Sequence, residues 1–223
     1  MVAVGGDRYL VGAERPAQRR LADGVVEHGH VSAPQPTGRA MAVTDPTHLA
    51  LVGLMGSGKS AVGQLVADRL GLPLVDVDDS IQARTGKNVR DLWESGGEEA
   101  YRPLEREIVL EALAPREPQV LAAPGGVVLD PVCVHALRQP HVGVVYLRAD
   151  PALLTQRVIA DPQPRPLLGS NPHHVLAVQH AARDGQYTEL ADLVLAVDVI
   201  SPEQAAERVL AAQIIAAPSP HSG

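Results

Sequence analysis

Short apolar runs alternate with stretches of helical spacing through most of the chain. Between residues 59 and 70 the apolar positions Val62, Val66 and Leu70 have helical spacing, and Gly71 follows as a C-terminal stop. The same pattern predicts five buried strands, over residues 49–52, 73–77, 120–122, 142–147 and 193–197. It predicts helices over 59–70, 80–85 and 89–94, in a longer stretch ending near 114, and after the Pro-containing starts at 150–151, 171–172 and 201–202. Alternating strands and helices indicate an α/β fold in which helices cover both faces of a parallel sheet.

The two ends of the chain lack this pattern. Residues 1–46 are rich in Gly, Arg, Ala and Pro and have no sustained helical or strand period. We interpret them as a disordered N-terminal extension, with a targeting or regulatory arm as the alternative. The folded domain is predicted over residues 47–213, and residues 214–223 are predicted to form a flexible tail.

Composition narrows the function classes. The 223 residues carry 19 Lys and Arg against 26 Asp and Glu, a net charge of −7 that disfavours bulk nucleic acid and anionic membranes. The chain has no Phe, one Trp and four Tyr. It therefore lacks the aromatic side chains of a stacking surface for nucleic acid. For the same reason its core must be built from Val, Leu, Ile and Ala. A single cysteine, Cys133, excludes an internal disulfide and is predicted to be a packed thiol. Without an apolar run of about 18 residues or a secretory signal, we expect a cytoplasmic protein.

A glycine-rich segment follows the first predicted strand. Residues 53–60, Gly-Leu-Met-Gly-Ser-Gly-Lys-Ser, fit the pattern G-x-x-x-x-G-K-[ST] and lead into an amphipathic helix, the context that a phosphate-binding loop requires. Lys59 would neutralise the β- and γ-phosphates of ATP, and the Ser60 hydroxyl would coordinate Mg²⁺. The other candidate ATP-binding residues are Gly56, Ser57, Gly58 and Ala61. The alternative interpretation is a glycine-rich turn that happens to precede a helix.

Carboxylates gather at the end of the second predicted strand. Asp76 and Asp78 are two apart on that strand and are therefore predicted to share a face at the carboxyl edge, where α/β sheets bind ligands. One carboxylate could hold the water shell of Mg²⁺ while the other orients a substrate hydroxyl. Asp79 is predicted to cap the next helix. The alternative is a simple strand-end turn.

Five motifs in order resemble the shikimate kinase family. They are residues 53–60 with 75–86, residues 97–102, Pro124-Gly125-Gly126, residues 165–168, and Arg183-x-x-x-Tyr187-x-x-x-Ala191-Asp192. The resemblance covers about residues 48–212. It implies a three-layer P-loop fold like that of nucleoside monophosphate kinases, with a five-stranded parallel sheet and a mobile lid. It also implies transfer of the γ-phosphoryl group of ATP to the 3-hydroxyl of shikimate on the route to chorismate. We expect the protein to be a monomer.

The resemblance also implies roles for individual residues. The aspartate matching Asp78 holds the substrate hydroxyls and is a candidate acceptor of the attacking proton, while the one matching Asp76 lies near Mg²⁺. Arginines matching Arg102 and Arg183 bind the shikimate carboxylate. The remaining matches are Gly125 and Gly126, which bring backbone against the acceptor ring, and Arg165, which closes over ATP from the predicted lid at 161–171. Lys59, Asp78 and Arg165 are thus the predicted catalytic residues.

The chain departs from the family pattern at three positions. Pro124 stands where the family usually has a glycine and removes one N–H donor. Pro103 follows Arg102 and is predicted to start or kink a helix. Ala61 replaces a second hydroxyl residue after Ser60. Two other functions stay open: a kinase for another polyol acid such as gluconate, and a non-catalytic nucleotide-binding regulator.

Overall fold

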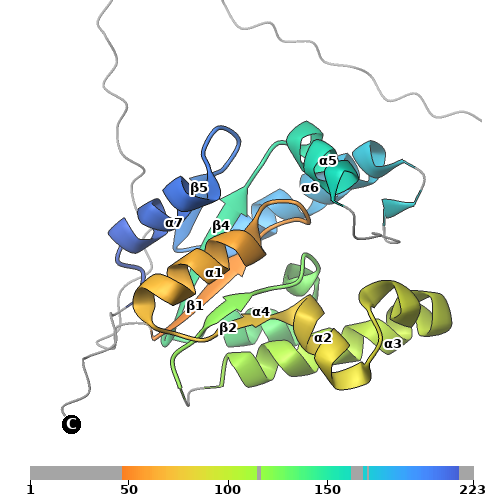
Figure 1. The fold of residues 1–223 in the computed structure, drawn as a ribbon, viewed down its shortest axis with the longest axis horizontal. Coiled ribbons are helices and arrows are strands. Elements are labelled where there is room, and N and C mark those ends of the chain that lie inside the picture. The colour runs from red at the N-terminus through yellow and green to blue at the C-terminus, as the bar shows by residue number, and fades with distance from the viewer. Residues whose placement is uncertain (1–46, 115–116, 162–167, 170, 216–223) are drawn as a thin grey trace, which may run out of the picture. The chain divides into compact units, whose positions relative to one another are not determined.

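The computed structural model describes residues 47–114, 117–161, 168–169 and 171–215. Within this part of the chain, five parallel strands form one sheet in the order β2-β3-β1-β4-β5 (Figure 1). The predictions for residues 1–46, for Arg165 and most of the lid, and for the end of the tail lie outside the described residues.

The elements follow the predicted alternation. The strands are β1 (His48–Val52), β2 (Leu74–Asp76), β3 (Val120–Ala122), β4 (Val142–Arg148) and β5 (Leu193–Ala196). The helices are α1 (Lys59–Leu70), α2 (Val77–Thr85), α3 (Val89–Ala112), the short 3₁₀ helix η1 (Val127–Leu129), α4 (Pro131–Leu137), α5 (Pro151–Ala160), α6 (Pro172–Leu190) and α7 (Pro202–Ala211). The five-stranded parallel sheet is confirmed.

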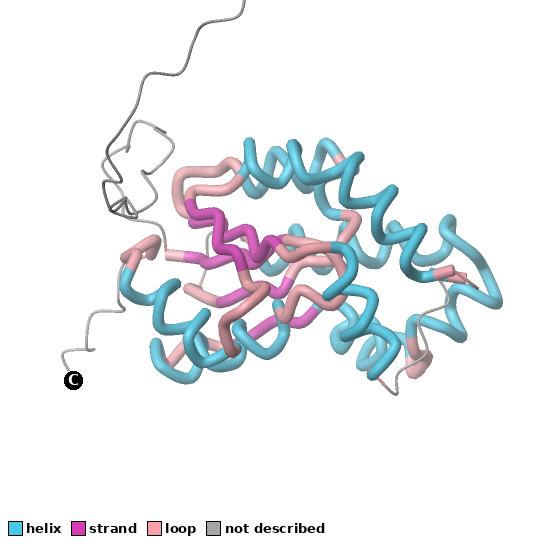
Figure 2. Tube along the Cα trace, turned by 90° about the horizontal axis from the view of Figure 1, so that it is seen from above, coloured by secondary structure: helices cyan, strands magenta, loops and turns pink. Residues whose placement is uncertain are grey.

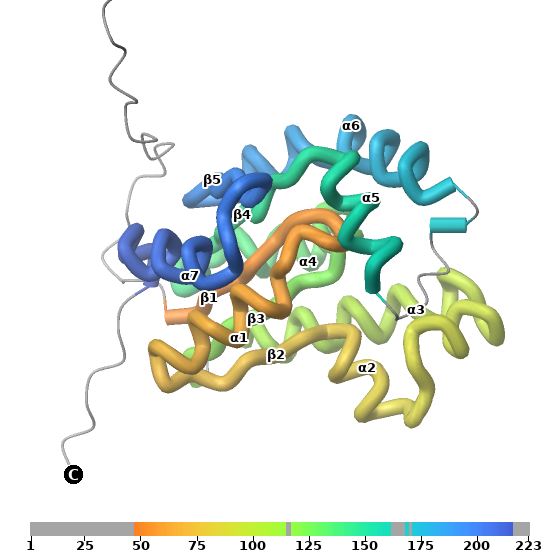
Figure 3. Tube along the Cα trace, turned by 45° about the horizontal axis from the view of Figure 1, so that its top comes forward, coloured from red at the N-terminus to blue at the C-terminus, as the bar shows by residue number. Residues whose placement is uncertain are grey.

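Helices cover both faces of the sheet. On one face α1 lies over β1 and β3 and packs against α7, while α4 and α6 pack on β4 from the other face (Figures 1 and 2). Strand β1 is central: Leu49 lies opposite Val120 on β3, and His48 lies opposite Val142 on β4. Because the strands are parallel, the segments that leave their carboxyl ends, including α2 and α5, emerge on the same side of the sheet (Figure 3).

The core is aliphatic, as the absence of Phe requires. Its buried side chains are almost all Val, Leu, Ile and Ala, joined by Tyr101, Tyr146 and Tyr187. Cys133 is 2 % exposed, which confirms the prediction of a packed thiol, and burial raises the pKa of this thiol to about 11. Ile214, just beyond the predicted domain end, packs against this core. Within the described ranges, every helix is too short or too polar to cross a membrane.

The β2–α2 junction differs from its prediction. Val77 begins α2, so Asp78 lies in the first turn of a helix and does not share a strand face with Asp76. Asp76, and not Asp79, is the N-cap: its Oδ1 accepts a hydrogen bond from the Asp78 amide at 3.0 Å. An aspartate side chain that satisfies a free helix N–H stabilises an earlier helix start. Apolar alternation alone could not distinguish this start from two further strand residues.

Two helices also differ from expectation. Helix α4 was not predicted, although Asp130 caps it and Pro131 occupies its first turn, the same signal that marks α5. Helix α3 is interrupted at Gly97, whose φ of 62° and ψ of −157° break the helical path, so the helix predicted over 89–94 and the longer stretch after it are two helical segments. Pro103 lies inside the second segment and has helical torsions, so it does not start a helix.

The buried His48 gives a pH-dependent stability. It is 1 % exposed at the start of β1, and its ring lies edge-on to His141 with the centroids 5.2 Å apart. Burial, and next the nearby His141, lowers the pKa of His48 below its usual value of 6.5. Below about pH 6.5 the His48 ring therefore binds a proton in the unfolded chain more readily than in the folded chain. The contribution of His48 to the free energy of unfolding is largest above about pH 6.5 and decreases as the pH falls toward the lowered pKa.

We therefore expect the melting temperature to fall between pH 7 and pH 5, and the fall to be smaller in His48→Gln. Thermal unfolding followed by circular dichroism across this range measures the effect. His173→Gln, which changes an exposed histidine, is the matched control and should keep the wild-type slope. An unchanged slope in His48→Gln would assign the acid sensitivity to other groups.

Candidate active site

The loop between β1 and α1 has the geometry of a phosphate-binding loop. Gly56 and Gly58 have φ angles of 82° and 94°, a region that L side chains rarely adopt. Among the described residues, no side chain caps the first turn of α1, so its first N–H groups are available to bind an anion. The half-buried Lys59 extends back over the loop, and its Nζ donates to the Leu54 carbonyl at 3.0 Å.

Two oxygen groups meet beside this loop. The Ser60 hydroxyl donates to Asp76 Oδ2 at 2.5 Å, which joins the start of α1 to the end of β2. A hydroxyl and a carboxylate are hard oxygen donors and fit Mg²⁺, which commonly takes one or two protein ligands together with substrate phosphates. No group of three or more His, Cys, Asp or Glu within the described ranges forms a self-sufficient metal site. Ala61, the next residue, is exposed.

Asp78 is held by a tyrosine from another helix. The Tyr101 hydroxyl donates to Asp78 Oδ1 at 2.8 Å, bringing α3 against α2. Tyr101 is 2 % exposed, and burial, followed by the charge of Asp78, raises the pKa of its hydroxyl. The hydroxyl therefore stays protonated and acts as a permanent donor. Sequence reasoning found Asp78 but not this partner.

Arg102 is placed by two glutamates on its own helix. Its Nε donates to Glu98 at 2.8 Å and its Nη1 to Glu105 at 2.6 Å. Glu105 is only 6 % exposed, and burial raises the pKa of its carboxyl against the lowering effect of Arg102. A Cβ built on Gly126 would overlap the Arg102 guanidinium, so a larger residue there would displace the end of the Arg102 side chain. Pro103 does not prevent Arg102 from reaching the loop after β3.

Arg183 reaches the same loop from the opposite side. Its Nη1 donates to the Gly125 carbonyl at 3.0 Å, and the Tyr187 hydroxyl donates to the same oxygen at 2.5 Å. The Gly125–Gly126 dipeptide therefore lies between two guanidinium groups, one from α3 and one from α6. The structure brings these predicted acceptor-site residues together.

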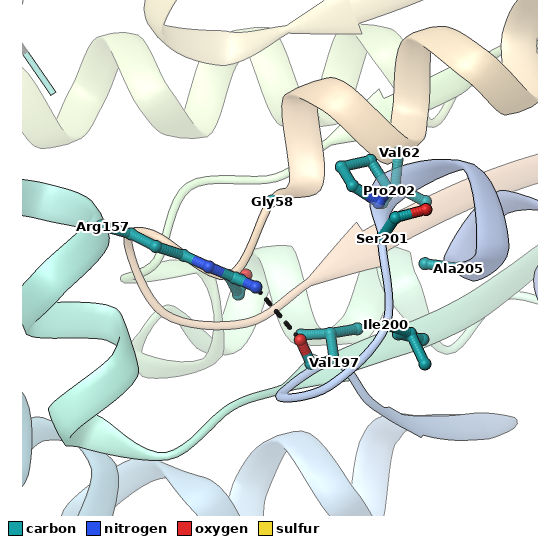
Figure 4. A pocket seen from close by; sticks show the side chains of 9 residues that line it. Gly58, Val62, Arg157, Val197, Ile200, Ser201, Pro202 and Ala205 are labelled. Atoms are coloured by element: carbon teal, nitrogen blue, oxygen red, sulfur yellow. Dashed lines mark hydrogen bonds between the residues drawn. The ribbon is translucent and has the colours of Figure 1, made fainter. Parts of the chain in front are cut away.

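A cavity of about 240 Å³ lies beside the phosphate loop. Its lining joins Ser57 and Gly58 to Arg157 on α5 and to apolar side chains from the β5–α7 loop and the start of α7, among them Ile200 and Pro202 (Figure 4). Arg157 donates to the Gly56 carbonyl at 3.2 Å and to the Val197 carbonyl at 3.1 Å. These two bonds hold a planar guanidinium at the cavity wall.

Sequence reasoning gave no role to four residues of this site: Tyr101, Glu105, Arg157 and Tyr187. Tyr101, Glu105 and Tyr187 lie three or four residues from a predicted arginine or next to it, so helical spacing could have suggested them. Arg157 had no such signal, because its partners are backbone carbonyls 40 and 101 residues away.

Together, the fold and the phosphate-binding loop define a P-loop kinase, and a cluster of carboxylates and arginines lies around the loop after β3. The shikimate kinase family model matches residues 55–213. The chain therefore belongs to the shikimate kinase family.

Individual relatives agree. The chain is 42% identical over 161 residues to the shikimate kinase of Thermobifida fusca, covering 71% of this chain and 90% of that protein. It is 44% identical over 156 residues to the shikimate kinase of Paracidovorax citrulli, covering 69% and 81%. Among solved structures, the shikimate kinase of Acinetobacter baumannii in complex with shikimate is similar with a TM-score of 0.69 and 32% identity, covering 74% of this chain and 91% of that one. The enzyme from Bacteroides thetaiotaomicron gives a TM-score of 0.66, 26% identity and coverages of 74% and 97%.

Proposed function

We propose that this protein transfers the γ-phosphoryl group of ATP to the 3-hydroxyl of shikimate. The observation that carries the proposal is the arrangement of Arg102 and Arg183 on either side of the Gly125–Gly126 dipeptide. A small acceptor bound there would have its carboxylate beside two guanidinium groups, which bind a carboxylate with paired hydrogen bonds. The relative of known structure with shikimate bound supports this choice of acceptor.

The nucleotide side of the site suits ATP. The phosphate loop, with Gly56, Ser57 and Gly58, would surround the phosphates with backbone N–H groups. The cavity lined by Arg157 and Pro202 is large enough for a nucleobase, and the guanidinium plane offers it a stacking surface. Arg165 remains a proposal from the family resemblance alone, as the residue that covers the phosphates.

In phosphoryl transfer the protein mainly positions the two substrates and supplies positive charge around the transferring group. The shikimate hydroxyl oxygen forms a bond to the γ-phosphorus as the bond from that phosphorus to the β–γ bridging oxygen breaks. Asp78 accepts the hydroxyl proton, held in place by Tyr101. Lys59 neutralises charge on the transferring group. Ser60 and Asp76 would hold Mg²⁺, which supplies further neutralisation of the phosphates when bound.

A coupled assay of ADP release tests the function. Purified protein with ATP and Mg²⁺ is given shikimate, gluconate or no acceptor. We expect acceptor-dependent ADP release with shikimate alone. Turnover with gluconate but not shikimate would favour the polyol-acid alternative. No turnover with either at millimolar concentration would favour a nucleotide-binding regulator.

Replacing Arg183 with alanine should raise the KM for shikimate by roughly 30-fold and leave the KM for ATP within about twofold. The reason is that a charge-assisted hydrogen bond to a carboxylate contributes about 1.5–3 kcal/mol. Steady-state kinetics with each substrate varied in turn measures the effect. Arg106→Ala removes an exposed arginine that pairs with Asp130, and should leave both constants near wild type. An unchanged KM for shikimate in Arg183→Ala would refute its role in acceptor binding.

A further inference from the structure

Tyr187 lies beside the acceptor site, although it has no role in the reaction described above. It is one helical turn after Arg183 on α6, so both side chains leave the same face of the helix. Its ring is 0% exposed, and burial raises the pKa of its hydroxyl to about 12, so the hydroxyl remains a donor at neutral pH. It donates to the Gly125 carbonyl, which also accepts from Arg183. The two donors fill both lone pairs of that oxygen.

The carbonyl belongs to the central peptide of a β-turn. The Val127 amide donates to the Pro124 carbonyl at 3.0 Å, which closes a turn over residues 124–127. Gly126 has φ −92° and ψ −2°, the values of the third residue of a type I turn. A type II turn differs by a flip of this peptide and favours glycine at the same position. A turn with two central glycines can therefore adopt either form. The hydrogen bond from the Val127 amide to the Pro124 carbonyl is present in both forms, so it does not favour one of them.

The hydrogen bonds to Gly125 select the type I form. In a planar trans peptide the C=O and the following N–H point in opposite directions. While the Gly125 carbonyl points to α6, the Gly126 N–H must point away from α6. A flip would reverse both groups and change the surface that the dipeptide presents between Arg102 and Arg183.

The two donors differ in how firmly they are held. The Tyr187 ring stacks on Tyr146 with centroids 4.8 Å apart and an angle of 28°. The Tyr146 hydroxyl donates to Asp184 at 2.9 Å, and Asp184 accepts two bonds of 2.8 Å from Arg148 at the end of β4. Tyr187 is thus anchored to the sheet on its buried side. Arg183 is only half-buried and, under the proposed function, directs donors to the substrate carboxylate.

We propose that Tyr187 is a positioning residue of the acceptor site: its hydroxyl holds the Gly125 carbonyl and keeps the 124–127 turn in its type I form while Arg183 binds the acceptor. This inference rests on the proposed function for its effect on catalysis. Its effect on the turn does not depend on which acceptor is phosphorylated.

The test is Tyr187→Phe, which keeps the stacked ring and removes only the hydroxyl. We expect the KM for shikimate to rise about tenfold, with kcat and the KM for ATP within about twofold of wild type. Tyr146→Phe is the matched control: it removes a hydroxyl from the other ring of the stack, while Arg148 still holds Asp184. Its KM for shikimate should stay within about twofold of wild type.

A second measurement reports on the turn without any substrate. In ¹⁵N relaxation dispersion, the Gly125 and Gly126 amides should show millisecond exchange in Tyr187→Phe and none in wild type or Tyr146→Phe. If the Gly125 and Gly126 amides of Tyr187→Phe show no millisecond exchange and the KM for shikimate is unchanged, the inference is overturned. An equal rise in both KM values with a lower melting temperature would also overturn it, because that is a purely structural effect. If wild type fails to phosphorylate shikimate, the proposed function fails, and the amide comparison still decides the role of Tyr187.

Discussion

We expect Lys59→Met to lower kcat/KM for ATP by about a thousandfold while the fold and the melting temperature are retained. Methionine keeps the length of the apolar stem but removes the charge that opposes the β- and γ-phosphates. Preorganised donors aimed at developing charge contribute a factor of about 10²–10³ each in enzymes. Steady-state ADP release measures the loss, and nucleotide titration separates weaker binding from slower transfer.

The chain offers one matched control. Lys87 is its only other lysine and lies exposed between α2 and α3. Lys87→Met should retain the wild-type rate, since it removes the same charge away from the phosphate loop. Equal losses in the two variants would mean that total charge, and not the position of Lys59, determines the rate.

Asp78→Asn should lower kcat by about a thousandfold with a small change in the KM for ATP. A general base typically contributes 10²–10⁴ in rate, and an amide cannot take the hydroxyl proton. Asparagine still offers an oxygen to the Tyr101 hydroxyl, so the contact between α2 and α3 is preserved. Single-turnover measurement of phosphoryl transfer, with bound ATP and saturating shikimate, isolates the chemical step.

Asp79→Asn is the control for this variant. Asp79 is the next residue of α2 and is exposed overall. Partial desolvation of its carboxyl, and next the charges of Asp76 and Asp78, raise its pKa. Its amide variant should stay within about threefold of wild type in kcat. If Asp78→Asn were as active as Asp79→Asn, the proton would have to leave the hydroxyl by another route, such as the phosphate itself.

The alternation of apolar strands and amphipathic helices was sufficient to predict the sheet. Strands in a sheet buried on both faces consist of continuous apolar runs, and the runs at Leu49 and Val142 are unambiguous. The ends of helices and strands were harder to predict wherever a polar side chain determines them. At Asp76 a single carboxylate–amide hydrogen bond ends the strand and starts the helix, which hydrophobic periodicity does not register.

The phosphate loop was predictable because its function needs a continuous sequence. The proposed acceptor site is assembled differently, from α2, α3, the loop after β3, and α6. Its motifs could be located in the chain, but the contacts between them depend on tertiary packing. Tyr101 reaches Asp78 across 23 positions and Tyr187 reaches Gly125 across 62, so no local pattern reveals either bond.

The central position of β1 has a consequence for synthesis on the ribosome. Its neighbours are β3 and β4, whose first residues, Val120 and Val142, are translated 72 and 94 positions after His48. The emerging chain therefore carries an apolar strand with both edges unpaired until more than half of the protein has been made. Such edges are prone to wrong pairing, and non-local parallel contacts form slowly. We therefore expect the phosphate loop, although encoded early, to acquire its shape only after β4 has emerged to pair with β1.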